Sequence, residues 1–367
     1  MKIVKVHASV HRVPGELPVS RKPAGDTLRV VCEIETDDGQ TGFGMTGRFL
    51  VHATAAAVNH HLGPAVIGLD PRDVEAVSAR MAGLASERGR MSGINLAAMS
   101  CIDLACWDLW GRSSGRSVAQ LLGGHADFAD VYVTFGFPTY DADELVEVAR
   151  MLIEKGHTRL KVLVGTKHGL AADIARVKRV RDAIGDDVML AMDANEGIPL
   201  ETAVALARGL EDVGIAWFED PIANNDARDL AMLRRKTTIP LSAGQMDGHS
   251  SRFRDWVEHD AIDIFMPNSM YNGGVTETRR VASLAHIYNR ALSDAGGGGV
   301  FSLHHVAGFA HGTLAEVHLG ADQVEHALFE NAPVPNGDRT AIPEAPGWGV
   351  TLDRERLRDT LVPAEAP

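Results

Sequence analysis

The stretch Val188-Met-Leu-Ala-Met-Asp193, with Ala216-Trp-Phe-Glu219 and Ile239-Pro-Leu-Ser-Ala-Gly-Gln245 beyond it, provides three hydrophobic runs that each end in a potential metal ligand. Glu219 follows Asp193 by 26 residues, and Gln245 follows Glu219 by 26 residues. This interval fits one strand, one helix and two short loops, so three successive parallel strands would bring the side chains to one end of a sheet. A single acidic residue there is often only a helix N-cap, but three at equal spacing favour a metal site. Since such oxygens suit Mg²⁺, we predict that Asp193, Glu219 and Gln245 bind it.

The composition restricts the class of protein. Of the 367 residues, 45% are hydrophobic, which is enough for a large core and, at this length, for a barrel with an appended domain. The formal net charge of −13 argues against a nucleic-acid partner and an anionic membrane surface. No apolar run is long enough to span a membrane. Because the three cysteines show no metal-binding spacing and the N-terminus has the pattern of a strand rather than a signal peptide, we expect a cytoplasmic protein.

The first third of the chain predicts an α+β domain over residues 1–125. Strand patterns flank the turn Asp37-Asp-Gly-Gln40, and the pattern becomes helical from Val51 to Gly124. The loop over residues 14–25 is rich in Pro and Gly, carries Arg21 and Lys22, and is long enough to cover a site.

After residue 125 strands alternate with amphipathic helices, which is typical of a parallel sheet with crossover helices. Eight strands are expected, at residues 131–135, 159–164, 188–193, 215–219, 239–243, 262–267, 291–295 and 327–330. Together they predict a closed (β/α)8 barrel of the TIM type over residues 126–330. Residues 331–367 then form a C-terminal segment that returns to the first domain. The run of glycines at 296–299 lacks the spacing of a nucleotide-binding loop, and either lets backbone approach a ligand or provides slack.

Several motifs in this order resemble the enolase superfamily and, within it, the mandelate racemase-like subgroup. They include Ala98-Met-Ser-Cys-Ile-Asp-Leu-Ala-Cys-Trp-Asp-Leu-Trp-Gly111, Leu190-Ala-Met-Asp-Ala-Asn195, Trp217-Phe-Glu-Asp-Pro221 and Pro346-Gly-Trp-Gly-Val350. The resemblance implies an α+β capping domain over a modified (β/α)7β barrel, with Mg²⁺ at the ends of its third, fourth and fifth strands. It also implies abstraction of the proton alpha to a carboxylate, through an enediolate whose charge the metal stabilises. A small carboxylate substrate and a homo-oligomer are further implications.

The chain departs from the subgroup at three positions. In Lys161-Val-Leu163-Val-Gly165 a leucine stands where the subgroup has its second lysine, usually the base, although both side chains should point into the barrel. Gln245 replaces a glutamate, which removes one negative charge from the ligand set, and Asp247 could contribute in its place. Asn268 stands where an aspartate often pairs with a catalytic histidine; an asparagine can orient an imidazole without raising its pKa.

The position of that histidine depends on how the seventh strand is counted. A strand at 291–295 puts Asp294 or Ala295 there, with His304 and His305 following in an enlarged loop. A strand at 300–304 puts His304 there instead. Under both counts, His304 or His305 can reach the mouth of the barrel.

Two interpretations follow. In the first the protein is a Mg²⁺-dependent lyase that dehydrates an acid sugar, with a racemase or epimerase of a 2-hydroxy acid or amino-acid derivative as the alternative. Lys161 and His304 or His305 would then move protons, and the residues expected to contact substrate are Asn195, Asn268, Glu330, Arg21, Lys22 and Arg48. In the second the protein is a non-catalytic ligand-binding scaffold, an interpretation based on Leu163, Gln245 and Asn268.

Overall fold

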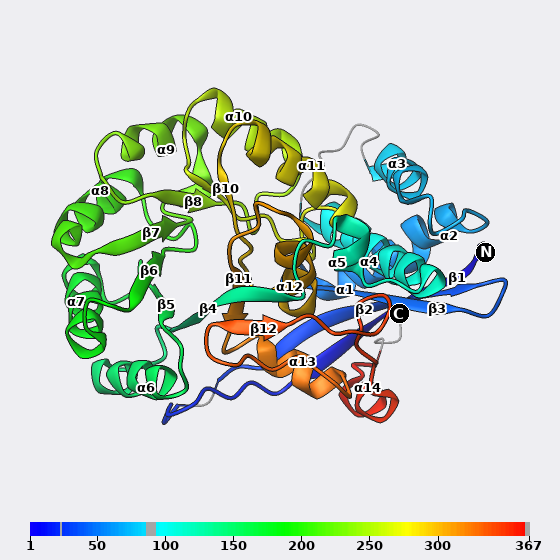
Figure 1. Ribbon diagram of the computed structural model, residues 1–367, viewed down its shortest axis with the longest axis horizontal. Helices are drawn as coiled ribbons and strands as arrows, with labels where there is room; N and C mark the ends of the chain where they lie inside the picture. Colours follow the sequence, from blue (N-terminus) through cyan, green and yellow to red (C-terminus); the bar gives the residue numbers. More distant parts are fainter. Residues whose placement is uncertain (23, 86–92, 364–367) are drawn as a thin grey trace.

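The computed structural model describes residues 1–22, 24–85 and 93–363. A ring of parallel strands surrounded by helices occupies one side of the molecule in Figure 1, and a smaller antiparallel sheet with its own helices lies against it. This architecture, a modified (β/α)7β barrel with an α+β cap, confirms the predicted fold class.

The cap is built on a three-stranded antiparallel sheet in the order β1-β2-β3. Its strands are β1 (Ile3–Val13), β2 (Thr27–Thr36) and β3 (Thr41–Gly47), and the turn at residues 37–40 joins the last two as expected. The segments that follow are α1 (Val51–Ala57), η1 (Val58–Leu62), α2 (Gly63–Val66), α3 (Val74–Ala85), α4 (Ile94–Ser114) and α5 (Val118–Leu122). Helix α4 packs closely on β3 because Gly44 has no side chain: a Cβ there would lie 2.2 Å from the carbonyl oxygen of Cys101.

The barrel strands lie in the order β10-β9-β8-β7-β6-β5-β4-β11. They are β4 (Phe128–Gly136), β5 (Arg159–Leu163), β6 (Met189–Asp193), β7 (Ile215–Glu219), β8 (Leu241–Ala243), β9 (Ile264–Phe265), β10 (Ala291–Leu292) and β11 (Ala315–His318). The helices between them are α6 (Ala142–Glu154), α7 (Leu170–Ile184), α8 (Leu200–Gly209), α9 (Ala227–Arg234), α10 (Ser250–Glu258), α11 (Val275–Ile287) and α12 (Gly299–Gly308). Hydrogen bonds from Thr313 N–H to the Leu292 carbonyl (2.8 Å) and from Asp294 N–H to the Leu314 carbonyl (2.9 Å) close the ring.

The predicted eighth strand is wrong. Residues 327–330 include the end of α13 (Asp322–Leu328), and Leu328 and Phe329 pack into the core of the cap. The eighth strand is β11, which has only four residues. Its short polar-apolar alternation, Ala315-Glu-Val-His318, places Glu316 and His318 on the inner side of the barrel while Ala315 and Val317 join the outer core.

The C-terminal residues contact both parts of the molecule. Strand β12 (Arg339–Ala341) pairs antiparallel with β4, while Trp348, Val350 and Leu352 are buried in the core of the cap ahead of α14 (Arg354–Thr360). The domain bounds at residues 125 and 330 stay a prediction.

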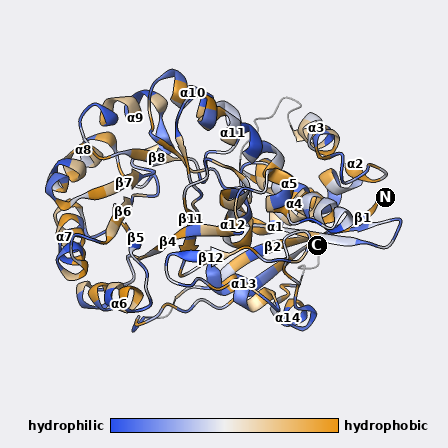
Figure 2. Cartoon of the chain, in the orientation of Figure 1, coloured by the Kyte–Doolittle hydropathy of each residue, from blue (hydrophilic) through white to orange (hydrophobic). Residues whose placement is uncertain are grey.

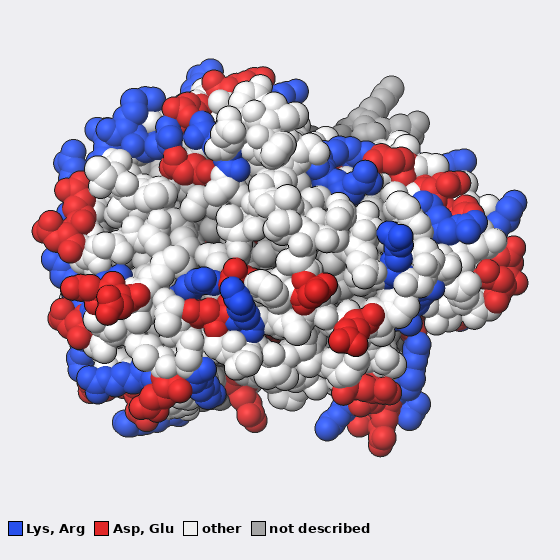
Figure 3. Space-filling view, in the orientation of Figure 1, with Lys and Arg blue, Asp and Glu red and all other residues white. Residues whose placement is uncertain are grey.

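Polar and charged side chains are spread over the outside of the molecule (Figure 2 and Figure 3). In Figure 2 the helices around the barrel carry both hydrophobic and hydrophilic residues, as expected of helices with one buried face. On the face shown in Figure 3, basic and acidic side chains are interspersed without an extended basic patch. Among the described helices, none is long and apolar enough to cross a bilayer.

Candidate metal centre and active site

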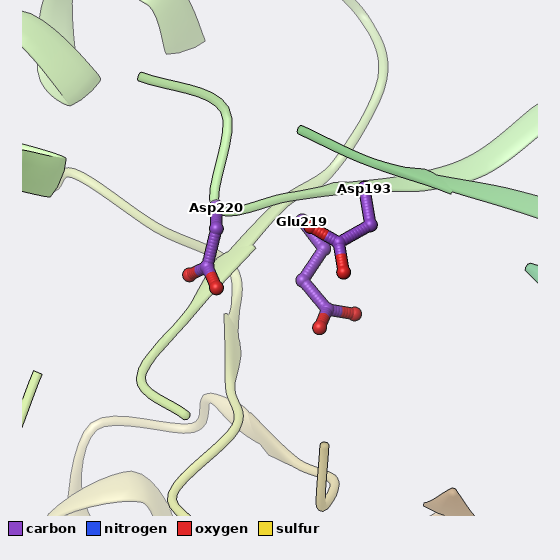
Figure 4. Close-up of side chains that lie close together, drawn as sticks. All are labelled: Asp193, Glu219 and Asp220. Atoms are coloured by element: carbon purple, nitrogen blue, oxygen red, sulfur yellow. The ribbon is translucent and has the colours of Figure 1, made fainter. Parts of the chain in front are cut away.

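Three buried carboxylates meet at the ends of two neighbouring strands (Figure 4). Asp193 ends β6 and Glu219 ends β7, and the two residues are paired in the sheet register. Asp220 follows directly with a φ of 40°, a left-handed conformation that turns the chain after the strand. One oxygen of each carboxylate lies within 4.8 Å of the others.

The chemistry of this cluster fits a divalent cation. All three side chains are buried, and burial raises the pKa of Asp193, Glu219 and Asp220, because each charge has lost its water. Carboxylate oxygens converging at this separation are the donor set of Mg²⁺ sites. Asp193, Glu219 and Asp220 could therefore hold the metal predicted from the sequence.

Lys161 lies at the centre of the barrel beside this cluster. Its Nζ is 2.7 Å from Glu219 Oε1, 3.0 Å from Glu316 Oε1 and 3.3 Å from Asp193 Oδ2, and its side chain is 1% exposed. Burial alone would lower the pKa of Lys161, but the charges of these carboxylates together raise it above its ordinary value. Lys161 is therefore a buried cation.

Glu316 is the main functional candidate that sequence reasoning missed. It projects from β11, accepts hydrogen bonds from the Thr134 hydroxyl and the Gly297 N–H, and pairs with Lys161. Although burial acts in the opposite direction, the charge of Lys161 helps to hold the pKa of Glu316 at about 2. The alternation in Ala315-Glu-Val-His318 was the available signal. Glu330, predicted to contact substrate from the last strand, lies after α13 and not on a barrel strand; it is exposed, and its N–H donates to the Thr351 carbonyl.

Gln245 reaches the cluster with its amide nitrogen. Nε2 donates to Asp220 Oδ2 at 2.6 Å and to Glu219 Oε1 at 3.2 Å. A half-turn of the amide would present the oxygen instead, and Gln245 as a ligand stays a prediction that requires this turn. The third carboxylate of the cluster is Asp220, which the pair Glu219-Asp220 could have indicated from the sequence.

The seventh strand lies within residues 291–295 and not at residues 300–304. Strand β10 is Ala291–Leu292, and His304 and His305 lie on helix α12. His304 accepts a hydrogen bond from the Ala119 N–H at Nδ1 and donates from Nε2 to the Trp348 carbonyl, both at 3.0 Å. Burial lowers its pKa to about 3, so the ring is neutral with both nitrogens occupied. This arrangement contradicts the prediction that His304 transfers protons.

His305 pairs with Asp294 rather than with the carboxylate cluster. Its Nδ1 is 3.3 Å from Asp294 Oδ2. The next residue, Ala295, belongs to the small core inside the barrel with Tyr132 and Trp217, so alternation places Asp294 on the outer side. A proton-transfer role for His305 stays a prediction.

The remaining predicted residues are dispersed. Asn268 spans the loop after β9, with Nδ2 donating to the Ala295 carbonyl (2.6 Å) and Oδ1 accepting from the Met270 N–H (2.9 Å), so it orients no imidazole. Asn195 is exposed, and its backbone N–H donates to Asp193 Oδ1 at 2.7 Å. Leu163 is paired with Asp193 in the register.

A cavity of about 910 Å³ lies between the cap and the mouth of the barrel. Arg48 lines it, whereas the Lys22 ammonium donates to the Thr139 carbonyl at 3.0 Å and the Arg21 N–H donates to Glu144. The histidines that line the cavity are His52 and His318.

Comparison with known proteins agrees with this geometry. Residues 2–123 match the family described as mandelate racemase / muconate lactonizing enzyme, N-terminal domain, and residues 144–356 match the family described as enolase C-terminal domain-like. The chain is 29% identical over 331 residues to arabinonate dehydratase of Saccharolobus solfataricus, covering 88% of each chain. It is 29% identical over 300 residues to N-succinyl-L-Arg/Lys racemase of Bacillus cereus, covering 78% of each. The crystal structure of L-talarate dehydratase from Polaromonas sp. JS666 complexed with Mg and L-glucarate superposes with a TM-score of 0.87 at 29% identity, covering 98% of this chain and 97% of that one.

Proposed function

Because the chain belongs to the mandelate racemase/muconate lactonizing enzyme family of the enolase superfamily, we propose that it is a Mg²⁺-dependent enzyme that removes the proton alpha to the carboxylate of a small organic acid. The observation that carries this proposal is the buried cluster of Asp193, Glu219 and Asp220 with the Lys161 ammonium 2.7 Å from Glu219. Bound Mg²⁺ would offset the negative charge that develops on the substrate carboxylate.

Lys161 is the residue we assign to the reacting end of the substrate. As a buried cation it binds and orients a carboxylate, which is where negative charge increases when the α-proton leaves. To act as the base it must first lose a proton, and its three carboxylate neighbours oppose that loss. Binding and charge stabilisation are therefore its roles in the arrangement described.

Within this chemistry we favour dehydration of an acid sugar. In that reaction a base takes the proton of the α-carbon, and the hydroxyl group of the neighbouring carbon leaves as water after an acid supplies one proton to it, so the substrate loses one molecule of water in total. Racemisation by two bases instead requires one base on each face of the α-carbon. Leu163 and Ala295 place no base on the inner side of β5 and of the segment after β10. His305 is then the one predicted proton acceptor that remains, and a single acceptor supports the dehydratase over the racemase or epimerase alternative.

Exchange of the α-proton tests the proposal directly. Acid sugars and N-acyl amino acids would be incubated with the protein and Mg²⁺ in D₂O and followed by proton NMR. We expect loss of the α-proton signal that requires Mg²⁺ and is abolished in Asp193→Asn but retained in Asp187→Asn, a change at an exposed position. Saturable binding without exchange or turnover would contradict the enzyme and support the non-catalytic scaffold, which the replacements at Leu163 and Gln245 motivate.

A further inference from the structure

Arg29 is a buried cation without a close counterion. It lies on the central strand of the cap, paired with His11 on β1 and Gly47 on β3, and is 5% exposed. Among the described residues, no carboxylate oxygen lies within 4.0 Å of its guanidinium, and its hydrogen bond is to the carbonyl of the preceding Leu28 at 3.2 Å. Burying an unpaired charge is costly, so this position calls for an anion.

Tyr271 and Glu325 are the acidic groups that act on Arg29, and neither forms an ion pair with it. Glu325 acts on Arg29 only at longer range, since its carboxylate accepts the Val300 N–H at 2.8 Å, and burial raises its pKa to about 7. Two acidic residues, Glu16 and Asp26, also line the cavity, and Asp26 Oδ2 lies 3.9 Å from Arg12 Nε. The Arg29 side chain passes close to Gly47, where a Cβ would lie 3.0 Å from Arg29 Cδ. The absence of a side chain at position 47 makes room for Arg29.

Arg29 faces the cavity between cap and barrel together with two other donors. Arg48 and His318 line the same cavity. The positive charge of Arg48 disfavours the protonated form of the His318 imidazole. His318 Nδ1 accepts the Ala321 N–H at 3.1 Å, and burial lowers the pKa of the ring to about 4. The neutral ring therefore carries its proton on Nε2 and is a hydrogen-bond donor.

His318 links the cavity to the inner side of the barrel. His318 follows Glu316 by two residues on β11, so the two side chains leave the strand on the same side about 7 Å apart. A ligand whose carboxylate meets Lys161 can thus extend past His318 into the cavity, whose volume suits a small molecule.

We propose that Arg29, with Arg48 and His318, binds a second anionic group of the substrate, so that the substrate is a dianionic acid rather than a simple aldonic acid. This inference rests on the proposed function for the place of the first carboxylate. The second group is a terminal carboxylate or a phosphate ester, because the guanidinium groups of Arg29 and Arg48 can bind both.

Calorimetric titration in Mg²⁺ distinguishes these ligands. Galactarate represents the dicarboxylates, 6-phosphogluconate the phosphorylated acids, and galactonate and gluconate the matched monoanions. We expect one dianion to bind at least tenfold more tightly than its matched monoanion. If that dianion is galactarate, the second group is a carboxylate; if it is 6-phosphogluconate, the second group is a phosphate ester. Arg29→Met should remove this preference, so that the dianion and its matched monoanion bind with affinities within about twofold of one another. Arg48→Met, at an exposed position, should reduce the preference without affecting folding, and Arg12→Met, outside the cavity, should retain it.

Equal affinity for dianions and monoanions, or no saturable binding of either dianion at millimolar concentration, would overturn the inference. So would a preference that survives in both Arg29→Met and Arg48→Met. If the proposed reaction does not occur, Mg²⁺-dependent exchange of the α-proton will be absent. That result leaves the comparison of ligand affinities between Arg29→Met and the natural protein unaffected.

Discussion

Lys161 Nζ lies 2.7 Å from Glu219 Oε1 inside the barrel, with both side chains enclosed. The pair joins β5 to β7 across the intervening β6, whose Asp193 also contacts the ammonium at 3.3 Å. One cation thus holds together side chains from separate strands, and the folding and the chemistry of the barrel depend on the same group.

Lys161→Met should destabilise the protein as well as inactivate it. Removing the ammonium leaves three buried carboxylates without their partner, and we expect a loss of about 3–5 kcal/mol in the free energy of unfolding without added metal. Denaturant titration measures this loss. Lys167→Met, at an exposed position, should change stability by no more than about 0.5 kcal/mol. A Lys161→Met protein as stable as this control would show that the cluster does not need its cation.

Gln245→Glu should make folding dependent on Mg²⁺. The substitution replaces an amide donor 2.6 Å from Asp220 Oδ2 with a further acidic oxygen, so the metal-free protein should lose stability through repulsion. The added carboxylate should also tighten Mg²⁺ binding about tenfold or more, because it restores a negative charge to the ligand set. Calorimetry and thermal unfolding with and without Mg²⁺ check both effects, with the exposed Asn289→Asp as control. An unchanged Mg²⁺ titration would mean that position 245 is not a ligand.

His304 should make stability depend on pH below neutrality. Its folded pKa of about 3 lies below the ordinary value of 6.5, so the unfolded chain binds more protons between these two values. The stabilising contribution is present above pH 6.5 and is lost as pH falls toward 3, up to about 5 kcal/mol. Unfolding free energies measured between pH 7 and 4 should fall less steeply in His304→Gln than in the natural protein, whereas the exposed His168→Gln should leave the slope unchanged. Identical slopes in all three proteins would contradict a buried neutral ring.

Gly44→Ala should loosen the cap. A Cβ at this position would lie 2.2 Å from the Cys101 carbonyl oxygen, so β3 and α4 would have to separate, at a cost of about 1–3 kcal/mol. Gly83→Ala is the matched control, because nothing lies within 4 Å of its Cβ and alanine favours the helix. Thermal unfolding should therefore move in opposite directions in the two variants, and equal midpoints would argue against the close approach.

The sequence predicts the barrel and half of its site because both depend on local patterns. Asp193 and Glu219 end hydrophobic runs at equal spacing, and the strands place them side by side as expected. Glu316 escaped notice because β11 is four residues long, while the more apolar residues 327–330 resemble a strand until their packing against the cap is known.

The histidines show a different limit. A helix presents its residues all round, and the sequence of α12 does not tell which neighbours its faces meet. His304 is held by backbone groups of α5 and of the C-terminal segment, 185 and 44 residues away along the chain. Arg29 is similar, since its significance comes from the missing counterion and from the cavity it lines, which only the assembled cap and barrel reveal.

The most direct measurement is anomalous diffraction from crystals soaked in Mn²⁺, a cation that prefers the same oxygen ligands as Mg²⁺. The account predicts a single strong peak between Asp193, Glu219 and Asp220, with carboxylate oxygens of that cluster at bonding distance. A peak elsewhere, or none at saturating Mn²⁺, would contradict it.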